Sequence, residues 1–456
     1  MRLDKKPNQN KTIRQKQNKP ISKQGLQGRL AAIDVLMDVF AKKTPLDISF
    51  DYHAKDLSTR DKPFCFALVN FVLRKTVAID SVIEKYMERP YDADSVERQI
   101  LRIGLAQLFF MNSVEEFACI HTSVEIAKIK SPRNANVVNG VLRNAQRTGF
   151  DFLEENSELL YEVPKWLSDI LSKDYPQKAA SLKSAMLEQG NVHVRLRDKA
   201  AKNFIEKNAR PVKYLAGAWV LKDNVDVNHI PKLDEFSVYV QDIASQLVGH
   251  ILSQKVENDG NLENKTRILD LCAAPGGKTI HLLDMLPYAE VTACDNNPKR
   301  LEILKSNLAT ACKNDKDRIS VVLNNALKPE FKKESFDYIL LDAPCSGLGI
   351  SRKHSDVIHI KQADDLQEIV KLQSEILPKA FSLLKKGGTM MYSTCSLLKD
   401  EGERQIDKFL ELNKNAETVN ISDIFDDIGK ISHQGYLRTF PTEEMDGFFM
   451  TLISKK

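Results

Sequence analysis

One short stretch limits most strongly what this chain can fold into. Residues 269–279 read Leu-Asp-Leu-Cys-Ala-Ala-Pro-Gly-Gly-Lys-Thr, an apolar run that ends in small residues before helical spacing resumes. This pattern predicts a strand, a tight glycine turn and a helix. The helix start leaves unpaired backbone N–H groups, and the glycines let a ligand approach the main chain. We therefore predict a nucleotide-like ligand on an open α/β sheet, either a dinucleotide or S-adenosylmethionine.

The triplet Gly277-Lys278-Thr279 resembles the end of a phosphate loop. A phosphate loop also requires a glycine at the position of Cys272. The sequence therefore argues against a nucleoside triphosphatase.

The C-terminal half, residues 237–456, alternates between strand and helix patterns. After the first strand we expect strands at 289–294, 319–323, 336–341 and 389–392, with helices between them. Such βαβ units build a doubly wound parallel sheet that binds ligands beyond the carboxyl ends of its strands. Two last strands, near 434–440 and 448–453, are close enough in the chain to pair as an antiparallel hairpin.

Three further regions precede this domain. Residues 1–25 form a basic tail that we expect to be disordered, either an arm for RNA phosphates or a solvated terminus. Residues 26–150 show helical spacing throughout, with turns predicted at Ser131-Pro132 and Thr148-Gly149. Residues 151–236 are mixed, and we expect a small α/β connecting subdomain there.

Composition excludes several classes of protein. A chain of 456 residues, 42% hydrophobic and 28% charged, is typical of a multidomain globular protein. It has no apolar run of about 18 residues and no secretory signal pattern, so we expect a cytoplasmic protein without a membrane partner. The seven cysteines are scattered without C-x-x-C pairs, which favours reduced thiols over disulfides or a metal site. The net charge of +4 is small, so any binding of a polyanion must come from local patches of basic residues.

The residues at the predicted strand ends indicate the chemistry. Asp295 ends the second strand, where a carboxylate can accept both ribose hydroxyls of either candidate cofactor. Asp342 and Cys345 share the turn after the fourth strand, and Cys395 follows the fifth. Hydride transfer has no use for two thiols, whereas methylation of pyrimidine carbon 5 needs a thiolate that adds to carbon 6. Asp342 is then the acid that bonds N3.

Several stretches together resemble a known family. Residues 60–62, 66–69 and 138–143 look like the helical fold of the antitermination factor NusB, an RNA-binding module. Residues 239–242, 272–278, 342–347, 394–396 and 446–449 are similar to the bacterial ribosomal RNA small-subunit methyltransferase B family, which consists of cytosine-5 methyltransferases with a NusB-like N-terminal domain. The resemblance covers nearly everything after the basic tail and implies a Rossmann-like, S-adenosylmethionine-dependent enzyme.

The resemblance also implies roles for individual residues. Cys395 is expected to be the covalent nucleophile, Cys345 to help release the methylated base, and Asp342 to contact the base beside the cofactor. The implied cofactor-binding residues are Cys272, Ala273, Ala274, Pro275, Gly276, Gly277, Lys278, Asp295, Arg300, Asn325 and Asp342. At Cys272 we expect backbone contacts rather than thiol chemistry. The implied partner is 16S rRNA, with cytosine 967 as a single-stranded or loop target, and we expect a monomer.

This chain departs from the family pattern in three places. Asn324-Asn325 replaces a Gly-Asp pair, which costs about 1 kcal/mol of cofactor affinity if a neutral amide bonds the adenine. Residues 352–356 lack the proline of an Arg-Arg-His-Pro-Asp stretch. Residues 398–402 lack the proline of the loop after the nucleophile, so we expect a more flexible loop.

Three alternatives stay open on sequence alone. The chain could be a catalytically weak or inactive RNA-binding assembly factor, a reading that only Asn325 supports. Alternatively, Cys345 could be the nucleophile, since both thiols lie at strand ends of one sheet. The same chemistry could also act on another rRNA cytosine or on a tRNA.

Overall fold

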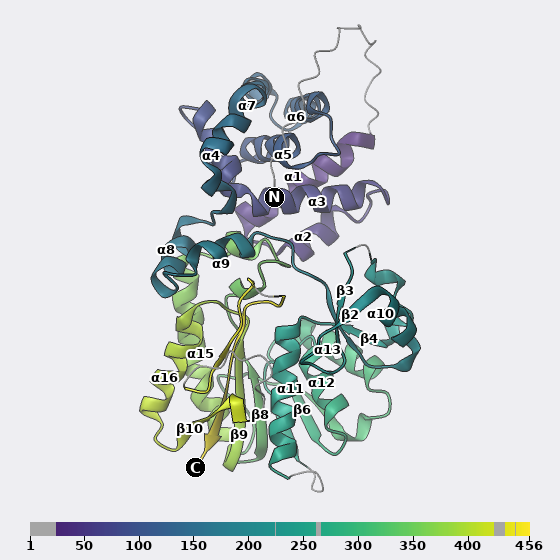
Figure 1. The fold of residues 1–456 in the computed structure, drawn as a ribbon, viewed down its shortest axis with the longest axis vertical. Coiled ribbons are helices and arrows are strands. Elements are labelled where there is room, and N and C mark those ends of the chain that lie inside the picture. Colours follow the sequence, from purple (N-terminus) through teal and green to yellow (C-terminus); the bar gives the residue numbers. More distant parts are fainter. Residues whose placement is uncertain (1–23, 224, 261–265, 424–433, 443) are drawn as a thin grey trace.

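Two main bodies stack along the long axis of the molecule, an all-helical one above an α/β one, with a small sheet beside the latter (Figure 1). This computed structural model describes residues 24–223, 225–260, 266–423, 434–442 and 444–456. The predicted basic tail lies outside the described residues, except that residues 24 and 25 begin the first helix.

The N-terminal body is helical, as predicted, and is built around α5. Its helices are α1 Gln24–Lys42, α2 Leu46–His53, α3 Asp61–Arg74, α4 Thr76–Tyr86, α5 Val96–Phe110, α6 Glu116–Lys130 and α7 Ala135–Glu155. Leu101 and Ile103 of α5 are fully buried, and α5 contacts α1, α3, α4, α6 and α7. Full burial of such a side chain contributes about 1.5–3 kcal/mol. The core therefore forms around one central helix.

The turn predicted at Thr148-Gly149 is wrong. Both residues lie inside α7, which continues to Glu155. A Cβ atom on Gly149 would stand 2.8 Å from Cζ of Phe109. This glycine permits close packing of α7 on α5 and does not end the helix. The turn predicted at Ser131-Pro132 is present between α6 and α7.

Residues 151–240 divide between two packing partners. Helices α8 Lys165–Asp174 and α9 Ala179–Met186 share a core with residues of the α/β body, such as Leu348 and Leu397. The small antiparallel sheet has the order β2-β3-β1-β4 and is packed with α10 Lys202–Asn208. Its strands are β1 His193–Leu196, β2 Ala209–Pro211, β3 Ala218–Leu221 and β4 Val238–Val240. The small sheet thus reaches past residue 236.

The large sheet carries the predicted strands in the order β10-β12-β9-β8-β5-β6-β7. Its strands are β5 Arg267–Asp270, β6 Glu290–Asp295, β7 Ile319–Leu323, β8 Phe336–Asp342, β9 Leu384–Thr394, β10 Ala416–Val419, β11 Leu437–Arg438 and β12 Phe449–Lys455. Strands β5 to β9 pair in parallel, whereas β12 runs antiparallel to β9 and pairs with β11. The predicted Rossmann-like sheet and its final hairpin are confirmed.

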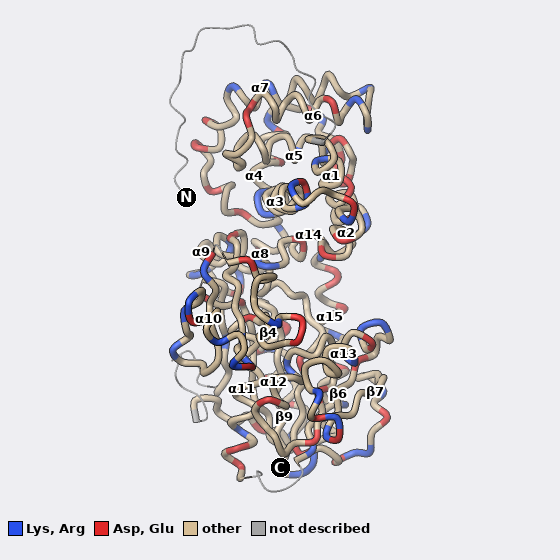
Figure 2. The backbone as a smooth tube through the Cα atoms, turned by 90° about the vertical axis from the view of Figure 1, so that its right-hand side faces the viewer, with Lys and Arg blue, Asp and Glu red and all other residues tan. Residues whose placement is uncertain are grey.

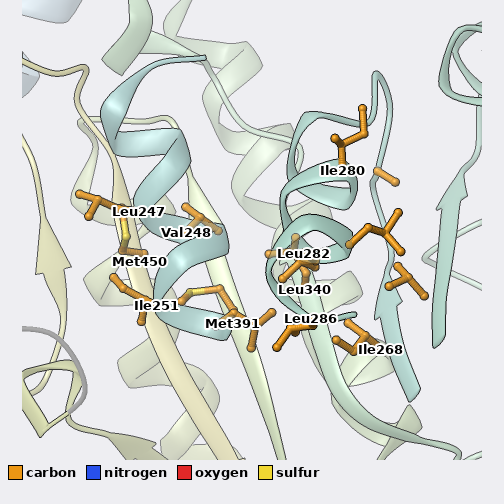
Figure 3. Close-up of a cluster of buried hydrophobic side chains, with 14 of the residues drawn as sticks. Leu247, Val248, Ile251, Ile268, Ile280, Leu282, Leu286, Leu340, Met391 and Met450 are labelled. Atoms are coloured by element: carbon orange, nitrogen blue, oxygen red, sulfur yellow. The ribbon is translucent and has the colours of Figure 1, made fainter. Parts of the chain in front are cut away.

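Helices cover both faces of this sheet, which buries a core on each side. One face packs against α11 Ile243–Asn258, α12 Gly277–Met285 and α13 Pro298–Ala311, the other against α15 Ala363–Leu383 and α16 Glu403–Leu412. Figure 3 shows the first core, in which Leu247 and Ile251 of α11 face sheet residues Met391 and Met450. None of the described helices is long and apolar enough to cross a membrane.

A seam of hydrogen bonds joins the helical body to residues 352–360, the segment that ends in the short helix α14 Val357–Ile360. The Asp356 carboxylate accepts a bond from the Leu46 backbone N–H at 3.0 Å, at the start of α2. The His359 ring donates from Nε2 to the Leu73 carbonyl at 2.7 Å. Because residues 352–360 follow the Cys345 turn, the helical body directly supports a segment next to a predicted site residue.

Candidate active site

The turn between β5 and α12 needs glycine at two positions. Gly276 has a φ of +109°, and a Cβ atom there would stand 2.9 Å from Cδ1 of Leu304. A Cβ atom on Gly277 would stand 2.9 Å from Cε1 of Tyr239. The backbone at Gly276 favours glycine because L side chains rarely adopt such a φ. The sequence therefore folds here into a narrow turn with α12 starting at its end.

Helix α13 holds this turn from outside. Arg300 donates from Nη2 to the Ala274 carbonyl at 2.6 Å, and Asn307 donates from Nδ2 to the Pro275 carbonyl at 2.8 Å. Nη1 of Arg300 also lies 3.4 Å from Oδ2 of Asp295, which is almost fully buried at the end of β6. Arg300 thus anchors both the turn and Asp295. Sequence reasoning missed Asn307, since its role depends on how α13 packs.

A cavity of about 240 Å³ lies under the turn. Its lining consists of Tyr239, Val240, Gln241, Ser245, Asp270, Cys272, Ala273, Ala274, Pro275, Gly277, Lys278 and Asp342. Most of the predicted cofactor-binding residues therefore line one cavity. Gly276, Asp295, Arg300 and Asn325 lie outside this lining. The Asn325 side chain is exposed, and its Oδ1 accepts from Leu327 N at 2.9 Å within its own turn.

The floor of this cavity contains a carboxylate that the sequence reading did not single out. Asp270 ends β5, is 1% exposed and accepts a bond from Thr279 Oγ1 at 2.6 Å on Oδ2. Its other oxygen has no hydrogen-bond partner in the described chain. Burial raises the pKa of Asp270 to about 7. An unpartnered acceptor in a cavity fits a ligand with ammonium and sulfonium groups, as S-adenosylmethionine has.

Lys278 and Asp342 form the far wall of the cavity. Lys278 Nζ lies 2.5 Å from Oδ2 of Asp342, and Ser393 Oγ donates to Oδ1 of Asp342 at 2.7 Å. Burial alone would lower the pKa of Lys278, but the adjoining Asp342 carboxylate outweighs burial and raises that pKa. The lysine is therefore charged, and both oxygens of Asp342 are held in fixed directions.

The two predicted thiols meet beyond this wall. Strands β8 and β9 are parallel neighbours, with Asp342 opposite Ser393 in the register. Just past these residues, Sγ of Cys345 and Sγ of Cys395 are 3.2 Å apart. The hydrogen bond with Cys395 and, as a smaller cause, burial raise the pKa of the Cys345 thiol well above its ordinary value. The structure thus brings together two thiols and the carboxylate on neighbouring strand ends.

The remaining cysteines have environments that suit unreactive side chains. All seven are free thiols, and Cys65, Cys119, Cys294 and Cys312 are buried. Burial raises the pKa of Cys65 and Cys294 to about 12 and of Cys312 to about 11. Protonated, buried thiols are poor nucleophiles.

A second cavity, of about 420 Å³, opens on the thiol side. It shares Lys278, Asp342 and residues of the 240–245 segment with the first cavity and adds Cys395 and Phe448. One cavity can therefore hold a methyl donor, the other a substrate, with the Lys278–Asp342 pair between them. This continuity is what group transfer between two bound molecules requires.

A charged cluster lines the second cavity and was missed from the sequence. Lys353 Nζ bonds the Asp242 carboxylate and lies 3.0 Å from Oδ2 of Asp446. His193 Nδ1 lies 2.7 Å from Oδ2 of Asp242. Burial raises the pKa of Asp446 to about 7. The cluster joins the small sheet, the start of α11, the segment after Cys345 and the C-terminal hairpin, so no local pattern reveals it.

The loop after Cys395, for which we predicted more flexibility, contains a short helical turn with a buried carboxylate. Lys399–Glu401 form a 3-10 turn, and the Glu401 side chain is fully buried. Its carboxylate accepts a bond from Ser396 Oγ at 2.5 Å. Side-chain bonding thus replaces the constraint of the missing proline.

The chain matches known proteins over both bodies. The profile of the family described as 16S rRNA methyltransferase RsmB/F matches residues 260–454, and that of the NusB family matches residues 26–147. The ribosomal RNA small subunit methyltransferase B of Vibrio cholerae is 32% identical over 444 residues, 94% of this chain and 97% of that protein. That of Xanthomonas campestris is 31% identical, covering 94% of this chain and 98% of that protein.

Solved structures share the fold. The crystal structure of PH0851 superposes with a TM-score of 0.74 at 20% identity, covering 94% of this chain and 99% of that one. NSun6 from Pyrococcus horikoshii, solved with SFG, gives a TM-score of 0.54 at 18% identity and covers 65% of this chain and 99% of that one.

Proposed function

The chain belongs to the ribosomal RNA small subunit methyltransferase B family, and from this membership we propose that it methylates carbon 5 of a cytosine in 16S rRNA through a covalent cysteine adduct. It is an S-adenosylmethionine-dependent RNA methyltransferase. The observation that carries the finer proposal is the pair of sulfurs 3.2 Å apart, one of which, that of Cys395, lines the second cavity together with Asp342, a residue that both cavities share.

The proposed reaction begins at Cys395, which lines the substrate cavity. Its thiolate adds to carbon 6, and the electron pair of the 5,6 double bond makes carbon 5 nucleophilic. Asp342, positioned by Lys278 and Ser393, acts here as a carboxylic acid: it shares its proton with N3, which neutralises the negative charge that develops on the ring. The cofactor supplies an electrophilic methyl group on its sulfonium.

Release of the product completes the proposed cycle. Once carbon 5 bears the methyl group, a base in the site takes the proton from carbon 5, the freed electron pair restores the 5,6 double bond, and Cys395 leaves carbon 6 as a thiolate. We assign Cys345 to this step because its sulfur stands next to that of Cys395. Loss of Cys345 then leaves the adduct intact, whereas loss of Cys395 prevents its formation.

We further propose how the RNA reaches the site. A cytosine must leave its stack to meet a thiol and a methyl donor in one pocket, so the expected target is single-stranded or looped. The resemblance points to cytosine 967. Figure 2 shows basic and acidic residues interspersed over both bodies. We therefore propose that single exposed basic residues, such as Arg143 and Arg147 of α7, contact the RNA phosphates. We propose a cytoplasmic monomer.

One experiment tests both the chemistry and the assignment of roles. Wild type, Cys345→Ala and Cys395→Ala are incubated with S-adenosylmethionine and 16S rRNA transcripts. We expect Cys345→Ala to accumulate a protein–RNA adduct that survives denaturation and Cys395→Ala to form none. Transcripts with uridine at position 967, and a tRNA, control for the target.

The possible outcomes separate the alternatives. An adduct on Cys395→Ala alone would make Cys345 the nucleophile. Absence of methylation on every RNA by wild type would favour an assembly factor without catalysis. Methylation of the uridine-967 transcript at an unchanged rate would move the target elsewhere.

A further inference from the structure

A buried carboxylate stands behind the two thiols. Glu401 ends the 3-10 turn Lys399–Glu401 and is 0% exposed. A buried charge is unfavourable by several kcal/mol unless hydrogen bonds compensate it. The identity of its donors therefore shows what this carboxylate does.

Two of the donors to the Glu401 carboxylate directly follow the thiols in the sequence. Ser346, next to Cys345, donates its backbone N–H to Oε2 of Glu401 at 2.8 Å. Ser396, next to Cys395, donates its hydroxyl to Oε1 at 2.5 Å. The two serine hydroxyls also lie 3.1 Å apart. One carboxylate thus bridges the turn that carries one sulfur to the turn that carries the other.

Glu401 is itself fixed by neighbouring elements. Gln373 of α15 donates from Nε2 to Glu401 Oε2 at 3.1 Å and to the Pro344 carbonyl at 2.8 Å. The Glu401 carbonyl accepts from Tyr392 Oη at 3.1 Å and from Thr394 Oγ1 at 3.3 Å. Both the side chain and the main chain of Glu401 are therefore held by residues that flank the thiols.

This bridge matters because the hydrogen-bonded pairing of β8 with β9 ends before the two cysteines. The ladder between β8 and β9 ends at Asp342 opposite Ser393, and both cysteines lie past it. We propose that Glu401 is a positioning residue that ties the two turns together and sets the separation at which Cys345 and Cys395 act on one base. This proposal rests on the proposed function.

The test uses the full chain with Glu401→Ala, Glu401→Gln and a matched control, Asp174→Ala. Asp174 is also buried, and its carboxylate accepts from Arg404 and from the Lys399 N–H on the outer side of the same loop. Neither of these donors belongs to the turns that carry Cys345 and Cys395. The control therefore disturbs the loop without removing the bridge.

Two quantities are measured. Without RNA or cofactor, diamide oxidises the paired thiols: a bond forms between Sγ of Cys345 and Sγ of Cys395, and diamide takes up the two hydrogens. Mass spectrometry of digests follows the rate of this cross-link, which reports sulfur proximity. With RNA, methyl transfer gives kcat and the KM for S-adenosylmethionine.

We expect Glu401→Ala to slow cross-linking strongly and to lower kcat by about a hundredfold, as misplacement of reacting groups by about 1 Å does, with KM nearly unchanged. The amide of Glu401→Gln keeps an acceptor for Ser346 and gains a donor to Ser396, but loses the charge. We expect both rates to fall by only about three- to tenfold. Asp174→Ala should retain both rates within about threefold.

Equal slowing by Glu401→Ala and Asp174→Ala, or no slowing by Glu401→Ala, would overturn the positioning role. If Glu401→Ala does not fold, Glu401→Gln decides: wild-type rates of cross-linking and transfer refute the proposal. Wild-type protein that cross-links but transfers no methyl group would refute the proposed function, while the cross-linking rates would still test Glu401.

Discussion

The Lys278–Asp342 pair, which lines both cavities, should be a strongly coupled ion pair. Lys278→Met, Asp342→Asn and the double variant form a mutant cycle that measures this coupling. The two side chains are 14% and 29% exposed, with Nζ and Oδ2 2.5 Å apart. Breaking a buried pair costs about 3–5 kcal/mol and an exposed one about 0–1 kcal/mol. For this half-buried pair we expect a coupling of about 2 kcal/mol.

The same sheet offers a control pair. Lys385 and Asp337 lie at the opposite end of β9 and β8, 2.6 Å apart, with side chains 41% and 29% exposed. Their coupling should stay below about 1 kcal/mol. Urea unfolding without cofactor measures the free energies, and methyl-transfer assays follow activity. Activity should fall in the Lys278 and Asp342 variants and persist in the control. Additivity within about 0.5 kcal/mol at Lys278 and Asp342 would refute the reasoning.

Two further predictions concern the glycine turn between β5 and α12 and the cavity beside it. Gly276→Ala should destabilise the protein by about 1–3 kcal/mol, because the backbone at Gly276 has a φ of +109°. The same substitution should weaken S-adenosylmethionine binding measured by calorimetry. Gly140→Ala, on an open face of α7, is the control and should instead stabilise the protein by about 0.5–1 kcal/mol. Loss of stability at Gly140 would contradict this contrast. For Asp270, the folded pKa of about 7 exceeds the unfolded value, so the folded state binds more protons and stability should fall as pH rises from about 4 to 7. The fall in urea midpoint over this range should be smaller in Asp270→Asn, and equal falls would contradict the prediction.

Local patterns explain which parts were predictable. The turn at 272–278 follows from small residues between an apolar run and helical spacing, and the structure has a glycine turn there. The meeting of Cys345 and Cys395 follows from their places after two parallel neighbours, β8 and β9. Both inferences need only the order of strands and the rule that parallel strands end at one edge.

Features that depend on distant partners were not predictable. Gly149 led us to predict a turn, but in the folded chain it packs against Phe109, which lies 40 residues earlier in the sequence. Glu401 looked like part of a loose loop because Ser346, which donates to it, is 55 residues away. Lys353 and Asp242 likewise meet only in the folded chain. A single sequence carries no signal for such pairs until the topology is known.

The seam formed by residues 352–360 determines how this architecture can be recombined. The Asp356 carboxylate caps the start of α2, and the His359 ring completes the end of α3 by bonding the Leu73 carbonyl. A chimera that exchanged only the N-terminal body would keep these buried groups paired only if α2 began and α3 ended at the same positions in the new body. The transplantable unit is therefore the helical body together with residues 352–360. Since that segment also places Lys353 in the second cavity, such grafts carry part of the proposed active site with them.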